Sequence, residues 1–220
     1  MLQAHRLLLK VAGFHVTLCG RFCPTHDTVV IVVADNEGKG IPGALLMART
    51  QSLLRAQMAE ALTPSAAVGA VSRALAAGPE PPGFVTLFLA KLDPASARLA
   101  YCDAGHCPAL LVRHGEVIKL DTGGLPLAVE LEEKYEEATV QLQPGDLLLM
   151  YTDGVTEAMN PKDDLFGLGR LCDLMKRSTA RTAEEAVAEV KAAIAEFRDG
   201  SKQSDDIVIL CLGVGEAAKA

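Results

Sequence analysis

Residues 28–47 read TVVIVVADNEGKGIPGALLM, and this stretch decides how the rest of the sequence is interpreted. The run 28–34 (TVVIVVA) predicts a buried β-strand that ends at Asp35. Gly38 and Gly40 permit a tight turn, and Pro42 suits the first turn of a helix that we expect over about 42–60. A buried strand, an acidic residue, a glycine-rich turn and a helix therefore follow one another.

Short apolar runs of the same kind recur along the chain and predict a meander of antiparallel strands. They cover residues 13–19, 28–34, 84–92, 97–103, 108–113, 116–120, 134–142, 146–151 and 206–212. A second helix over about 64–77 would pair with the first, and residues 182–198 carry an apolar stripe at helical spacing. Because strands and helices occur in separate blocks, the pattern favours an α+β layered sandwich over a doubly wound parallel sheet.

Length and composition indicate one domain with a sizeable core, since the chain has 220 residues of which 50% are hydrophobic. The net charge is −7 and the Lys and Arg residues are scattered, so we expect neither a nucleic-acid nor a membrane partner. No apolar run reaches the roughly 18 residues of a membrane span. The six cysteines are too sparse for a disulfide-stapled secreted fold, and we expect a cytoplasmic protein with reduced thiols.

Acidic residues stand at three strand ends: Asp35, Asp153 and the pair Asp205-Asp206. Each could be a simple turn residue, because Asp-Asn and Asp-Gly are common turn dipeptides. A carboxylate at the end of a buried strand is costly, however, unless it is paired, hydrogen-bonded or bound to a cation. Three such positions suggest one shared site for Mg²⁺ or Mn²⁺ and hence phosphoester hydrolysis.

Two other ligand classes fit the sequence poorly. The Gly38-Lys39-Gly40 turn lacks the Gly-x4-Gly-Lys-Ser/Thr pattern of a nucleotide-binding loop, and Lys39 could equally be solvated or reach toward a phosphate. Cys102, His106 and the other cysteines contain no Cys-x2-Cys pair, which argues against a zinc site.

Six segments together resemble the PPM-type metal-dependent serine/threonine protein phosphatases, in the bacterial sporulation and stress-response (SpoIIE-like) branch. They are residues 35–47 (DNEGKGIPGALLM), 84–88 (FVTLF), 103–108 (DAGHCP), 144–157 (PGDLLLMYTDGVTE), 166–167 (FG) and 205–208 (DDIV). The resemblance covers about residues 13–213 and implies that residues 1–220 are a single phosphatase domain. It also implies a four-layer α/β/β/α sandwich of two antiparallel sheets flanked by helices.

The same resemblance implies the site and the activity. Asp35 and Asp153 would be the catalytic residues, and Asp35, Asn36, Asp153 and Asp205 would hold two Mn²⁺ or Mg²⁺ ions, with Asn36 offering its backbone carbonyl. No further cofactor is implied. A hydroxide bridging the ions would attack a phosphoserine or phosphothreonine of a partner regulatory protein, such as a small anti-anti-sigma-like regulator. The alternative is a weakened or inactive module that binds a phosphoprotein, and a homodimer remains open.

One metal ligand of the family is missing from this sequence. The family has a Gly-Gly-Asp-x-Tyr-Asp segment before the Asp35 strand, and its first Asp helps to hold the second metal. Either Arg21 replaces that Asp, or the motif is deleted before His26 and residues 20–24 (GRFCP) precede the gap; we favour the deletion. Asp27 could substitute for the absent ligand.

Further residues are expected to act around the ions. Thr152 and Glu157 flank Asp153 and would orient ligands or water, although turn or cap roles fit them equally. His106 lies in an Ala-Gly-His turn that resembles a family turn, where we expect a hydrogen-bonded structural role rather than proton donation. Since the helix pair over 42–60 and 64–77 follows the Asp35 turn, contacts on it are expected to regulate activity.

Overall fold

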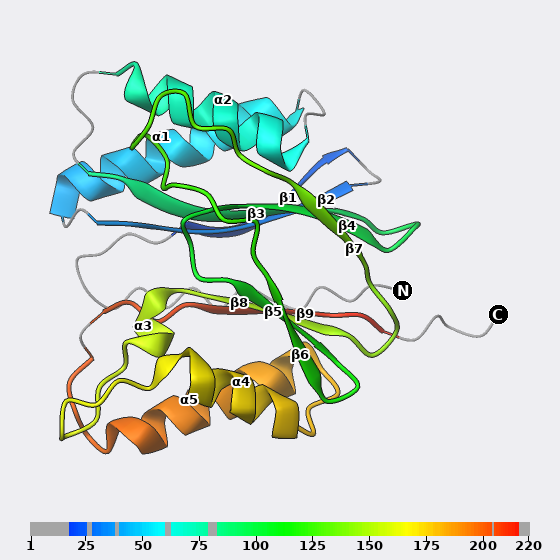
Figure 1. Cartoon of the computed structure of the whole chain (residues 1–220), viewed down its shortest axis with the longest axis vertical. Helices are drawn as coiled ribbons and strands as arrows, with labels where there is room; N and C mark the ends of the chain where they lie inside the picture. Colours follow the sequence, from blue (N-terminus) through cyan, green and yellow to red (C-terminus); the bar gives the residue numbers. More distant parts are fainter. Residues whose placement is uncertain are drawn as a thin grey trace. The chain divides into compact units, whose positions relative to one another are not determined.

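The computed structural model of the chain describes residues 18–25, 28–37, 40–59, 63–78, 83–203 and 205–215. These residues form two compact units, each of which contains one sheet (Figure 1). The five-stranded unit comprises the described residues from Leu18 to Pro108 together with Asp121–Leu142. The four-stranded unit comprises Ala109–Leu120 and the chain from Gln143 onward.

The five-stranded unit has the strand order β1-β2-β3-β4-β7, and every neighbouring pair is antiparallel. The strands are β1 (Leu18–Thr25), β2 (Thr28–Asn36), β3 (Val85–Asp93), β4 (Arg98–Ala104) and β7 (Ala138–Gln141). Side chains alternate between the two faces of a strand, so Val30, Val32 and Ala34 share one face and join the core under the helices. Asp35 consequently belongs to the opposite face.

Helices α1 (Gly40–Ala59) and α2 (Pro64–Ala76) cover one face of this sheet (Figure 1). The buried residues of α1 recur every three or four positions, as an amphipathic helix requires: Gly43, Leu46, Met47, Thr50, Leu54 and Met58. Thr63 caps α2 by accepting a hydrogen bond from the Ala66 amide, and proline occupies its first turn. The Arg49 guanidinium donates to the Ala74 carbonyl at 2.6 Å and so links the two helices. The expected helix pair is therefore present.

The four-stranded unit has the order β6-β5-β8-β9, again antiparallel throughout. Its elements are β5 (Ala109–Arg113), β6 (Glu116–Leu120), β8 (Leu147–Tyr151), α3 (Asp153–Thr156), α4 (Gly167–Arg177), α5 (Ala183–Arg198) and β9 (Ile209–Gly213). All five residues of β8 are buried. Helix α5 begins with a capping box, in which Thr182 and Glu185 each bond the other's backbone amide.

The expected α+β class, with antiparallel sheets flanked by helices, is confirmed. The single meander is wrong, because the chain changes sheets after β4, after β6 and after β7. Of the strand expected at 13–19, residues 18 and 19 belong to β1, which continues to Thr25, and residues 13–17 lie outside the described residues. Among the described residues, no helix is both long and apolar enough to cross a membrane.

Candidate metal centre

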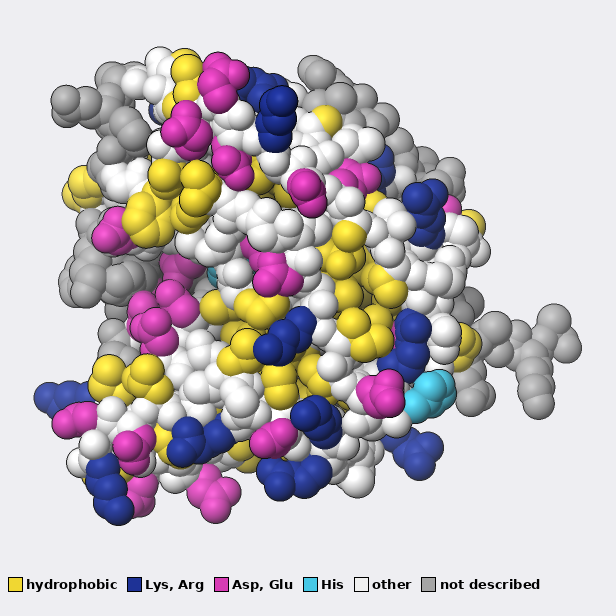
Figure 2. All heavy atoms as spheres, viewed as in Figure 1, with side chains coloured by type: hydrophobic (Ala, Val, Ile, Leu, Met, Phe, Trp, Pro, Cys, Tyr) yellow, Lys and Arg dark blue, Asp and Glu magenta, His cyan; other side chains and the backbone are white. Residues whose placement is uncertain are grey.

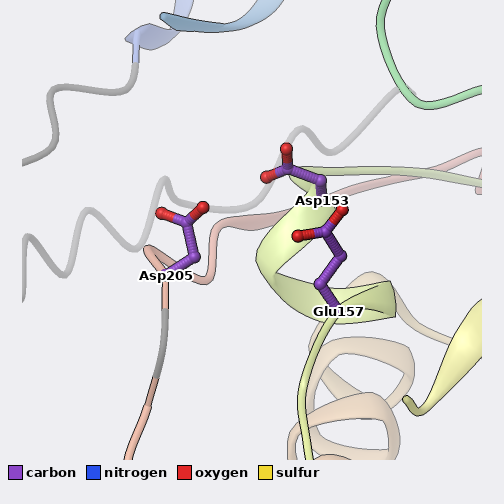
Figure 3. Close-up of side chains that lie close together, drawn as sticks. All are labelled: Asp153, Glu157 and Asp205. Carbon is purple, nitrogen blue, oxygen red and sulfur yellow. The ribbon is translucent and has the colours of Figure 1, made fainter. Parts of the chain in front are cut away.

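Two carboxylates of the candidate site stand on one helical turn directly after β8. Asp153 is the first residue of α3, and Glu157 ends the helix four positions later. Residues four apart in a helix lie on the same side, so the two side chains project in one direction (Figure 3). The buried strand β8 fixes where this turn begins.

Asp205 approaches the same turn from the segment that precedes β9 (Figure 3). One ligand oxygen each of Asp153, Glu157 and Asp205 can be chosen so that all three lie within 4.8 Å of one another. These oxygens are close enough to bind one ion, because ligand oxygens stand about 2.0–2.6 Å from Mg²⁺ or a similar hard cation. The structure therefore assembles a three-carboxylate cluster inside the four-stranded unit.

A buried threonine holds the Asp205 segment in place. The Thr152 hydroxyl donates to the Asp206 carbonyl at 2.8 Å and accepts from the Val208 amide at 3.0 Å. Gly154 allows the close approach, since a Cβ atom there would overlap the Asp206 carbonyl oxygen. Of the two roles considered for Thr152, the structure supports orientation of a ligand-bearing segment, because its side chain makes no capping bond to α3.

The cluster is electrostatically unfavourable without a cation. Burial raises the pKa of Glu157, and the neighbouring charges of Asp153 and Asp205 raise it further. An all-oxygen donor set of this kind suits Mg²⁺ or Mn²⁺ better than zinc. The residues present therefore fit a hard divalent ion.

Asp35 and Asn36 end β2 in the five-stranded unit, and both are buried. The Asn36 amide donates to Asp35 Oδ1 at 2.8 Å, and the Thr86 hydroxyl donates to the Asp35 carbonyl oxygen at 3.4 Å. Thr86 is the β3 residue opposite Asp35 in the sheet register. The expected convergence of Asp35 with Asp153 and Asp205 stays a prediction, because Asp35 belongs to the other unit.

Asp153 and Asp205 are metal ligands predicted from the sequence, whereas Glu157 is expected there only to orient ligands or water. The signal available was the spacing of four between Asp153 and Glu157, but a helix of one turn has no apolar periodicity to reveal it. Lys39 lies outside the described residues.

The β1–β2 register bears on the alignment that puts Arg21 in the place of the missing ligand. Arg21 pairs with Ile31, four residues before Asp35, which is about 13 Å along an extended strand. Arg21 is therefore not at the Asp35 end of the sheet, whereas the favoured deletion of the motif before His26 stays a prediction.

Asp27 itself lies outside the described residues. The substitution of Asp27 for the missing ligand therefore stays a prediction.

Charged side chains of both signs are mixed on the described part of the face in Figure 2, where Lys and Arg lie singly or in small groups among Asp and Glu. That face carries no continuous positive strip of the kind that binds a nucleic-acid backbone.

Comparison with solved structures identifies the fold class. The PP2C phosphatase domain of SpoIIE from Bacillus subtilis, solved with a fragment of its regulatory domain, superposes with a TM-score of 0.80 at 20% identity. The match covers 92% of this chain and 58% of that one. The chain thus has the PP2C-like fold of the PPM-type phosphatases, with antiparallel sheets and flanking helices.

The family follows from the sequence. The family model described as "Stage II sporulation protein E (SpoIIE)" matches residues 25–215. The chain belongs to the SpoIIE family of PPM-type serine phosphatases, in its RsbU/SpoIIE-like bacterial branch, as the sequence motifs predict.

Two curated relatives show how far the similarity reaches. Phosphoserine phosphatase RsbU of Bacillus subtilis (strain 168) is 24% identical over 191 residues, which are 86% of this chain and 57% of RsbU. Protein IcfG of Synechocystis sp. (strain ATCC 27184 / PCC 6803 / Kazusa) is 30% identical over 131 residues, 59% of this chain and 20% of IcfG. The chain therefore spans less than two thirds of the length of either relative.

Proposed function

We propose that this chain hydrolyses phosphoserine or phosphothreonine on a partner regulatory protein, with the help of Mn²⁺ or Mg²⁺. The proposal rests on the cluster of Asp153, Glu157 and Asp205, in which one ligand oxygen of each residue lies within 4.8 Å of the other two. Membership of a phosphatase family supports it, as does the relative RsbU, a phosphoserine phosphatase.

The cluster would hold one ion through three carboxylates. We propose Asp35 and the Asn36 carbonyl as further metal ligands on the ground of the sequence motif at residues 35–47 alone. A bound divalent ion would supply positive charge for the phosphoryl group and would lower the pKa of a water molecule. Two solved structures of similar fold support the ion class: a SpoIIE phosphatase domain described as Mn presoaked, and RsbX in complex with magnesium.

The chain's own residues have two tasks in this proposal. Thr152 and Gly154 keep Asp205 against the α3 turn, so the three carboxylates are positioned before an ion arrives. The negative cluster also repels a phosphate dianion in the absence of a cation, which makes substrate binding dependent on the ion.

The substrate is a folded or flexible protein segment rather than a nucleic acid, since the net charge of −7 disfavours a polyanion. We place this reaction in the cytoplasm, on the sequence-based expectation that the six cysteines are reduced.

The second candidate function is a weakened phosphatase that mainly binds its phosphoprotein. One observation favours it: residues 1–26 contain no Asp or Glu, so the family's upstream ligand carboxylate has no counterpart there. In that case metal binding persists while turnover is low.

The test is release of phosphate from p-nitrophenyl phosphate and from a phosphoserine peptide in the presence of Mn²⁺. Asp153→Asn should lower activity by at least about 100-fold, while Asp173→Asn, an exposed acid on α4, should not change it. Wild-type protein that binds Mn²⁺ but releases no phosphate would favour the second candidate. Full activity of Asp153→Asn would contradict the proposal itself.

A further inference from the structure

Four polar residues form a hydrogen-bonded chain at the Asp35 end of the five-stranded sheet. The Thr86 hydroxyl lies 3.4 Å from the Asp35 carbonyl oxygen and 2.9 Å from His106 Nδ1. The His106 amide donates to Asp103 Oδ1 at 2.8 Å. These hydrogen bonds therefore link the turn after β4, through β3, to the last residues of β2.

Strand alternation places these groups together. Asp35 stands opposite Thr86 in the register, and both belong to the face turned away from α1 and α2. Phe88 and Asp103, the next pair along this face, are also opposite each other. A threonine hydroxyl thus occurs where every neighbouring β3 residue is apolar.

The Thr86 hydroxyl lies between two partners. A backbone carbonyl can only accept, so the contact with Asp35 uses the hydroxyl proton of Thr86. When Thr86 donates to Asp35, its oxygen can accept a proton from His106 Nδ1, and donor and acceptor in the 2.9 Å contact follow the His106 tautomer.

The backbone that carries His106 is held by its surroundings. Gly105 has φ +69°, and a Cβ atom there would lie 2.8 Å from Pro126 Cδ, so the Ala-Gly-His turn accepts only glycine at this position. The Asp103 amide donates to Thr122 Oγ1 at 2.8 Å, and Asp103 Oδ1 accepts from the His106 amide. The turn therefore places the His106 ring beside Thr86.

We infer that Thr86 and His106 are positioning residues that hold the Asp35–Asn36 segment in the conformation needed for metal binding. The inference rests on the proposed function, in which Asp35 and the Asn36 carbonyl are ligands. The Asn36 amide already uses Asp35 Oδ1. The direction of the carboxylate consequently depends on the backbone that Thr86 braces.

The experiment compares matched variants of the whole chain by Mn²⁺ calorimetry, phosphatase kinetics and thermal unfolding. Thr86→Val keeps the shape but removes the hydroxyl, and His106→Ala removes the imidazole. We expect each to weaken Mn²⁺ binding by about 10-fold or more and to lower kcat, as loss of ligand-orienting groups generally does.

Conservative replacements should restore much of the lost affinity. Thr86→Ser retains the hydroxyl, and His106→Asn places a side-chain N–H near the position of Nδ1. The double variant Thr86→Val/His106→Ala should be little worse than either single one, because the two residues act as one unit. Thr139→Val, an exposed β7 threonine in the same sheet, is the control and should change neither affinity nor kcat.

Two results would overturn the inference. If Thr86→Val and His106→Ala lower only the melting temperature and leave Mn²⁺ affinity unchanged, their role is structural. Asp35→Asn separates the ligand role of Asp35 from the positioning role of Thr86 and His106. Unchanged Mn²⁺ binding in that variant would refute the ligand role of Asp35 and, with it, the positioning role. Loss of binding in Asp35→Asn with normal binding in Thr86→Val would refute the bracing alone.

Discussion

The Thr152 hydroxyl donates a hydrogen bond of 2.8 Å to the backbone carbonyl of Asp206, across 54 residues of chain. Thr152 is completely buried, and its amide also donates to the Val208 carbonyl at 3.1 Å. The Thr152 side chain therefore connects the end of β8, directly before Asp153, to the segment that carries Asp205.

Thr152→Val should loosen this connection. The Val208 amide and the Asp206 carbonyl would both lose their hydrogen bond to the Thr152 hydroxyl. A buried polar group left without a hydrogen bond costs about 1–3 kcal/mol of stability. We expect a corresponding loss in the free energy of unfolding and about 10-fold weaker Mn²⁺ binding. Denaturant unfolding and calorimetry measure the two effects, and Thr152→Ser should recover both. Equal stability of the Val and Ser variants would show that the hydroxyl does not hold the segment.

Gly154→Ala tests the same junction through backbone contact. The new methyl group would overlap the Asp206 carbonyl oxygen and come within 2.9 Å of the Asp206 carbonyl carbon, so the Asp205 segment must move. We expect a lower melting temperature and weaker Mn²⁺ binding. Gly169→Ala is the matched control, because no atom lies within 4 Å of its added Cβ and alanine favours a helix by up to about 1 kcal/mol. Identical behaviour of the two variants would contradict the close approach.

Several elements could be predicted from the sequence because their local patterns agree with their final environment. Six of the seven residues of TVVIVVA are apolar, and the run lies within β2, while Thr182 and Glu185 mark the start of α5. Strand β1 continues to Thr25, beyond the run expected at 13–19, because hairpin pairing with β2 rather than the local pattern decides where it ends. The contribution of Glu157 depends on tertiary packing, since only the approach of the 205–208 segment turns a helix end into a carboxylate cluster.

The buried carboxyl of Asp103 should make stability depend on pH. Burial raises its pKa from 3.8 to about 7, the charge of Asp121 adds to the rise, and the His106 amide opposes it. The folded state therefore binds this proton more tightly than the unfolded state does. The stabilisation of the folded state by this proton on Asp103 is fully present below about pH 4 and is lost as the pH rises toward about 7 and beyond.

Asp103→Asn removes this dependence while keeping an oxygen for the His106 amide. Denaturant unfolding between about pH 4.5 and 8 should show a smaller decline in the free energy of unfolding with pH in the variant than in the wild type. The exposed Asp173→Asn variant should follow the wild type. A variant curve parallel to the wild-type curve would rule out Asp103 as the source.

Helix α1 presents two large apolar side chains to solvent directly after the Asp35 turn. Ile41 is 76% exposed and Leu45 65% exposed, and they stand one turn apart. We expect Ile41→Ser and Leu45→Ser to change phosphatase activity with Mn²⁺ at least about 3-fold while altering stability by no more than about 0.5 kcal/mol, as exposed positions do. Ala56→Ser, exposed on the same helix, serves as control. Activities equal to this control would count against regulation through α1.

Metal stoichiometry tests the consequence of the missing ligand. Residues 1–26, which include β1, contain no acidic residue, so none of them can supply the carboxylate that the family places before the Asp35 strand. The cluster of Asp153, Glu157 and Asp205 can hold one ion with three carboxylates, whereas a second ion would meet less compensating negative charge. We therefore expect calorimetric titration with Mn²⁺ to give one tight site and a second at least about 10-fold weaker. Turnover should be slow, because one ion lowers the pKa of the attacking water less than two ions would. Asp153→Asn should abolish the tight site and leave the thermal melting of the metal-free protein largely intact. Two tight sites of equal affinity would show that a residue outside the upstream segment completes the second one.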